Sequence, residues 1–75
     1  MTQSNYSGYS QAVIYCTQDF DPRALRLPGF NGSAQVIRAG NSVDQAEIVA
    51  FMLMKGCDED AILLSPPLYG VGFIK

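Results

Sequence analysis

Asp58, Glu59 and Asp60 are the most concentrated group of chemically active side chains in this 75-residue chain. Three consecutive carboxylates could pair with arginines of a basic partner, bind Ca²⁺, or keep a loop solvated. The spaced ligands of an EF-hand loop are absent from this stretch. Because the three acids follow a predicted helix C-terminus, where the helix dipole disfavours anions, we treat them as candidate partner-binding residues.

The two cysteines, Cys16 and Cys57, and the lack of histidine limit the remaining chemistry. Without histidine there are too few ligands for zinc, and neither cysteine has a sequence neighbour that would lower its thiol pKa. Gly70-x-Gly72 has no helix after it, so it is not a dinucleotide-binding fingerprint. We therefore expect two small buried thiols in a reducing compartment and no enzyme activity, metal or cofactor.

The charge balance and hydropathy limit the classes of partner. The net charge is −2, and a nucleic-acid-binding surface would need Arg23, Arg26 and Arg38 to converge. The longest apolar run, Ile48 to Met54, is far shorter than a membrane span, and residues 1 to 6 lack the features of a signal peptide. We expect a soluble, cytoplasmic protein with no direct nucleic-acid partner and no membrane.

A helix is predicted from Ser42 to Gly56. Ser42 can cap the helix and Gln45 stands three residues later, at the spacing of a capping box. Lys55 lies in the last turn, where a cation is favoured, and Gly56 can adopt the left-handed conformation that ends a helix.

Short apolar stretches around this helix are predicted as strands. Ala24–Leu27 is either a short strand or a helical turn, and the others are Ala12–Thr17, Ala34–Ala39, Ala61–Leu64 and Tyr69–Ile74. The order β-(β)-β-α-β-β predicts an α+β domain, with one helix packed on a small antiparallel sheet of three to five strands. Gly70 and Gly72 share one face of the last strand and leave room for the helix. Residues 1–10 form a polar tail, partly ordered by Tyr6 and Tyr9, and residues 11–75 form the single domain.

The predicted helix has two apolar faces. The first, Ala46, Val49, Ala50 and Leu53, is expected to pack on the sheet, which leaves Ile48, Phe51 and Met52 on the opposite face. Either the Asp19–Ser33 segment or the tail covers this second face, or it contacts a second copy or a foreign partner. Together with the acids and an interfacial tyrosine, the candidate partner-binding residues are Ile48, Phe51, Asp58, Glu59, Asp60 and Tyr69.

The C-terminal half runs Arg38-Ala39-Gly40-Asn41-Ser42, a helix with alanine and methionine, Gly56, an Ile-Leu-Leu strand, and Gly-Val-Gly-Phe-Ile. This layout resembles that of some small phage-encoded anti-CRISPR proteins of the type I systems. The resemblance implies a non-enzymatic inhibitor in the host cytoplasm that binds a CRISPR surveillance complex or its nuclease. In that role Asp58, Glu59 and Asp60 would face a basic DNA-binding surface. The alternative is a homodimeric structural or accessory module whose second helix face is the dimer interface.

Overall fold

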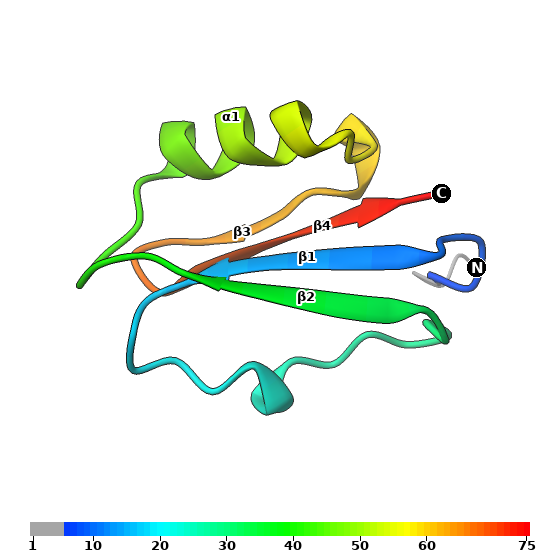
Figure 1. The fold of residues 1–75 in the computed structure, drawn as a ribbon, viewed down its shortest axis with the longest axis horizontal. Helices are drawn as coiled ribbons and strands as arrows, with labels where there is room; N and C mark the ends of the chain where they lie inside the picture. The colour runs from blue at the N-terminus through cyan, green and yellow to red at the C-terminus, as the bar shows by residue number, and fades with distance from the viewer. Residues whose placement is uncertain (1–5) are drawn as a thin grey trace, which may run out of the picture.

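The fold is a four-stranded sheet with one helix on one face and a long connection on the other (Figure 1). The computed structural model describes residues 6–75. The elements are β1 (Gln11–Cys16), β2 (Ser33–Arg38), α1 (Gln45–Lys55), β3 (Leu63–Ser65) and β4 (Tyr69–Ile74), with short 3-10 helices η1 (Pro22–Ala24) and η2 (Glu59–Ala61). The α+β class with a single packed helix is confirmed. The part of the predicted tail before Tyr6 lies outside the described residues.

The sheet has the order β2-β1-β4-β3 and is mixed rather than wholly antiparallel. β1 pairs parallel with β2, from Gln11 opposite Ser33 to Cys16 opposite Arg38. A parallel pair needs a crossover of a dozen or more residues, which the 17–32 connection provides by running back along one face of the sheet. The predicted strand-or-turn at Ala24–Leu27 is part of this crossover and forms no strand. The last two strands form the antiparallel β3–β4 pair.

A separate apolar core lies on each face of the sheet. On the helix side the buried residues are Val13, Val43, Ile48, Met52 and Cys57. On the crossover side they are Ala12, Ile14, Cys16, Ala61, Val71 and Phe73. β1 contributes to both cores, as expected for an inner strand whose two faces are both apolar.

The helix presents to the sheet the face that we expected to point outward. Ile48 and Met52 are 0% exposed, whereas Leu53 is 46% exposed. A Cβ on Gly70 would collide with Ile48, and one on Gly72 would lie 2.7 Å from the Met52 Sδ atom. The predicted glycine face is therefore confirmed, but the predicted core face of the helix is wrong. The Ile48 and Met52 side chains are larger than those of Ala46 and Ala50, so they bury more apolar surface area in the space above the glycines.

The crossover and the tail cover the other face of the sheet and not the helix. Tyr6 stacks on Phe73 with ring centroids 4.2 Å apart, and Phe20 stacks on Tyr69 at 4.4 Å. The alternative in which these segments fold over the second helix face is therefore wrong, because the sheet covers that face. Their aromatic rings instead pack on the face of β4 that carries Tyr69, Val71 and Phe73.

Candidate protein-binding site

The outward side of α1 is an apolar surface that no other part of residues 6–75 buries. We call it the outer face, made of Ala46, Val49, Ala50, Leu53 and Met54. Met54 is 77% exposed and Val49 is half-buried. Most of this face, with Asp44 and Gln45 at its N-terminal end, lines a shallow open depression. Large exposed apolar side chains that lie next to one another are typical of contact surfaces.

The ends of α1 fix where this surface begins and ends. Asp44, and not the predicted Ser42, is the N-cap residue, and its side chain makes no capping hydrogen bond. Val43 is buried and its backbone N–H donates to the Pro67 carbonyl at 3.1 Å, which holds this residue outside the helix. Gly56 ends the helix as predicted, with a left-handed φ of 92°.

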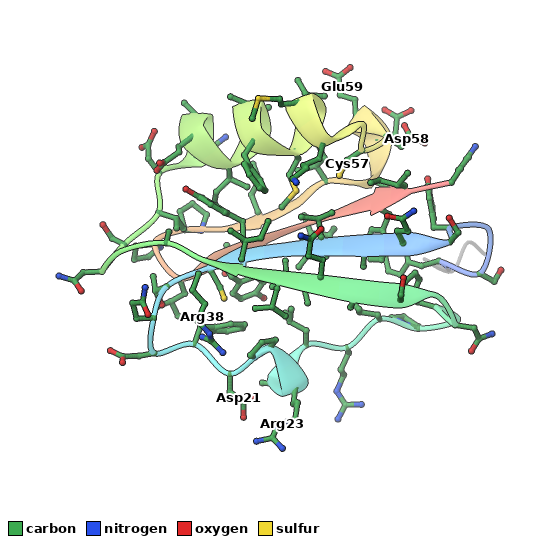
Figure 2. The ribbon with its side chains drawn as sticks, in the orientation of Figure 1. Asp21, Arg23, Arg38, Cys57, Asp58 and Glu59 are labelled. Atoms are coloured by element: carbon green, nitrogen blue, oxygen red, sulfur yellow. The ribbon has the colours of Figure 1, made fainter. Side chains whose placement is uncertain are left out.

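Acidic residues dominate the charge of the helix layer. Between residues 44 and 60 there are five carboxylates and one lysine, a net charge of −4, against two carboxylates and four cations elsewhere in the chain. The ammonium group of Lys55 lies 5.6 Å from the centroid of the Phe51 ring. Figure 2 shows Glu59 beyond the C-terminal end of α1, pointing away from the sheet, while Arg23 and Arg38 lie in the opposite layer. The outer face is thus bordered by carboxylates at both ends.

The acidic triplet divides into one structural residue and two exposed ones. Asp58 is half-buried, accepts a hydrogen bond from the Asp60 backbone N–H at 3.2 Å, and accepts another from the Tyr9 hydroxyl at 3.0 Å. This hydrogen bond to Asp58 is the main reason why the pKa of Tyr9 is raised. Glu59 and Asp60 are exposed and remain available to a partner. Within residues 6–75, no three cysteine or acidic side chains come together as a metal site.

The structure does not gather the other predicted contact residues around Glu59 and Asp60. Ile48 is fully buried, so its assignment as a contact residue is wrong. Phe51 is half-buried and stacks on Tyr15 at 4.6 Å. Tyr69 packs on the face of the sheet opposite α1, and so it cannot share one surface with the two acids.

Tyr15, beneath Phe51, is linked to the first turn of the helix. Its hydroxyl donates to the Glu47 carboxylate at 3.2 Å. Burial is the main cause of its raised pKa, and the hydrogen bond to Glu47 adds to it. Tyr15 therefore fixes the start of α1 relative to β1.

The cysteines are packing residues in different layers. Cys57 lies beneath the helix with its Sγ 3.8 Å from the Met52 Sδ, and burial raises the pKa of its thiol. Cys16 is fully buried on the crossover side. A raised thiol pKa reduces the thiolate fraction at neutral pH, so the site of Cys57 does not activate a nucleophile.

Two of the three arginines already have partners inside the chain. The Nη1 group of Arg38 shares its two N–H donors among three carbonyls of the crossover, those of Thr17, Gln18 and Phe20, at 3.3, 3.2 and 2.8 Å. Arg23 pairs with Asp21 at 3.4 Å, and hydrogen bonds from the Arg23 backbone and side chain lower the pKa of this carboxyl group. Arg38 thus ties the crossover to β2, whereas the exposed Arg23–Asp21 pair contributes little to stability.

None of the outer-face residues was among the contact residues predicted from the sequence, because four of the five were assigned to the core face of the helix. The pair of glycines in β4 could have identified the buried face of the helix. Gly70 and Gly72 leave space for two large side chains one helical turn apart above them. Ile48 and Met52 have this spacing, and assigning them to the sheet leaves Leu53 on the outside.

The fold and the site together define a small α+β domain with an apolar helix face bordered by acidic residues. Comparisons with protein-family models, curated proteins and solved structures found no match. Within the described part of the chain, no helix has the length and apolar character to cross a membrane.

Proposed function

We propose that this protein works by binding another protein through the outer face of α1, and that it is not an enzyme. The observation that carries the proposal is the exposure of Leu53 and Met54 on a helix whose opposite face already supplies the core. Burying a large apolar side chain contributes about 1.5–3 kcal/mol, so these two residues could anchor a partner.

The charges around the outer face indicate the chemistry of that partner. Asp44 lies at one end of the apolar stripe, and the exposed Glu59 lies beyond the other. A complementary segment carries apolar side chains in the middle and arginine or lysine on either side. Rim charges of this kind mainly accelerate association, so capture of the partner should weaken as salt is raised.

The most specific form of the proposal is an anti-CRISPR protein acting in the host cytoplasm. In this form it binds a type I surveillance complex or its nuclease and blocks DNA access or recruitment. Two things support it: the layout of the C-terminal half, and acidic side chains suited to a basic DNA-binding surface. The alternative of a homodimer through α1 has less support, because antiparallel pairing would bring Asp44 of one copy close to Glu59 and Asp60 of the other.

A tagged pull-down from bacteria that express a type I CRISPR complex tests the proposal. We expect stoichiometric capture of a surveillance subunit or the nuclease, and loss of that capture in Leu53→Asp. Leu68→Asp is the matched control, because Leu68 is 50% exposed in the β3–β4 turn and is not part of the outer face. Circular dichroism checks that both variants are folded.

Two results would count against the proposal. If Leu53→Asp is captured as well as the unaltered protein, the outer face is not the binding surface. If no CRISPR component is captured at all, the anti-CRISPR form is refuted. Glu59→Lys should reduce capture most at low salt if the carboxylates border the site.

A further inference from the structure

The two edges of the sheet are protected to very different degrees. β3 has only three residues and runs directly into Pro66 and Pro67, and short length and proline both prevent a strand from pairing with another chain. β2 has six residues, no proline, and no charge before Arg38. Figure 1 shows it as the outermost strand at the opposite edge. Among the helices and strands of residues 6–75, β1 is the one that packs extensively against β2.

The hydrogen bonds that flank β2 define which of its backbone groups are open. The Ser33 N–H donates to the Ser10 carbonyl at 3.2 Å, and the Ala39 N–H donates to the Cys16 carbonyl at 2.7 Å. In a parallel pair, alternate residues of a strand direct both backbone groups to the neighbour. Ser33, Gln35, Ile37 and Ala39 therefore face β1. The alternate residues, which are Ala34, Val36 and Arg38, direct their N–H and C=O groups outward.

We propose that β2 pairs antiparallel with β2 of a second copy, which joins the two sheets into one continuous sheet. A two-fold axis at Val36 places Val36 opposite its own counterpart and Ala34 opposite the second copy's Arg38. All three open residues are then paired, with up to about six backbone hydrogen bonds. This surface is separate from the outer face of α1, and the inference does not rest on the proposed function.

The side chains of β2 favour a second copy over a foreign strand. Ala34, Gln35 and Val36 are small or uncharged and exposed, so they offer little by which a particular foreign sequence could be selected. In the two-fold register no two like charges stand opposite each other. Arg38 does not obstruct the edge, because its guanidinium is bonded to carbonyls of its own crossover.

The expected dimer is weak. A single pair of six-residue strands is at the small end of protein interfaces, so we expect a Kd on the order of 10–100 µM. Dimerisation would bring two outer faces of α1 into one particle, and a partner with two basic segments would then bind with higher avidity.

Sedimentation equilibrium from about 5 to about 500 µM, combined with amide hydrogen exchange, tests the inference. We expect the mass to rise towards that of a dimer. Exchange at Ala34, Val36 and Arg38 should slow as concentration rises, whereas Gln35 and Ile37 should be protected at every concentration. A monomer throughout the range overturns the inference. So does a dimer in which the three open amides exchange as fast as in the monomer, because that dimer uses another surface.

Variants of Val36 separate pairing from folding. Val36→Lys places two cations opposite each other and should weaken dimerisation at least about tenfold, while Val36→Thr should preserve it. Val36→Pro removes an outward N–H but no hydrogen bond to β1, so it should also weaken dimerisation. If Val36→Pro fails to fold, Val36→Lys still tests whether β2 forms the dimer. Leu53→Asp should leave dimerisation unchanged, so failure of this inference is distinguishable from failure of the proposed function. A Val36→Lys protein that dimerises as well as Val36→Thr would contradict the assigned edge.

Discussion

Gly72→Ala tests the close approach between helix and sheet on which the assignment of the outer face depends. The added Cβ would lie 2.6 Å from the Cys57 Sγ and 2.7 Å from the Met52 Sδ. Comfortable contacts between such atoms are about 3.5–4.0 Å, so the helix layer would have to move by about 1 Å at this point. Gly72 does not have a left-handed φ, and its backbone therefore accepts alanine.

Overpacking of this kind typically costs about 1–3 kcal/mol. Replacing glycine by alanine in a strand returns about 0.5–1 kcal/mol, because the unfolded chain loses conformational freedom. We therefore expect a net destabilisation of about 1–2 kcal/mol. A domain of this size has a free energy of unfolding of about 4–11 kcal/mol, so the variant should fold with a Tm lower by about 4–16 °C.

Urea unfolding and thermal scans followed by circular dichroism measure this effect. Gly40→Ala is the matched control, because nothing lies within 4 Å of its added Cβ and its φ is not positive. We expect this control to change stability by less than about 0.5 kcal/mol. Combining Gly72→Ala with Cys57→Ala should cost less than the sum of the two single changes. A Gly72→Ala protein as stable as the Gly40→Ala control would refute the packing of α1 on the glycine face.

Two further predictions concern the crossover and the helix-side core. Arg38→Met removes the Nη1 donors that three crossover carbonyls share and should lower the free energy of unfolding by about 1–2 kcal/mol. Arg38→Lys should recover only part of this loss in the same urea assay. Burial raises the pKa of the Cys57 thiol above its usual 9.0 and that of the Tyr15 hydroxyl above 10.0, so the folded state keeps these protons to higher pH than the unfolded state does. The free energy of unfolding should therefore be constant below about pH 9 and fall as the pH rises through the native pKa values. Urea titrations from neutral to alkaline pH measure this fall, which should begin at a higher pH in Cys57→Ala.

Local chemistry allowed the main elements to be predicted from the sequence. β1 is rich in β-branched and aromatic residues, β4 alternates cleanly, and Gly56 ends the helix through its left-handed φ. The parallel pairing of β1 with β2 was not predictable, because it depends on the path of the crossover over one face of the sheet. The start of α1 was also misplaced, since a long-range bond from Val43 to Pro67 competes with the local cap at Ser42.

The candidate site was predictable only in part. Three adjacent acids were easily recognised, but their roles were not, because Asp58 is engaged by Tyr9 from the distant N-terminal segment. The choice between the two apolar faces of α1 likewise depends on which side chains lie above Gly70 and Gly72. Both outcomes are set by contacts between residues far apart in the chain.

The two-sided core gives a reason to connect the outer face with binding. In a chain of 75 residues, the large side chains of the helix-side core and the aromatic residues of the crossover already cover both faces of the sheet. Leu53 and Met54 belong to neither core, so an uncharged polar residue with good helix propensity, such as glutamine, should change the free energy of unfolding by less than about 0.5 kcal/mol at either position. Folding therefore does not require an apolar side chain at these positions, while solubility would favour a polar one. If Leu53→Gln unfolds the domain, this reasoning fails together with the proposed binding surface; if Leu53→Gln leaves stability unchanged and the folded Leu53→Asp protein is not captured, contact with a partner accounts for the leucine.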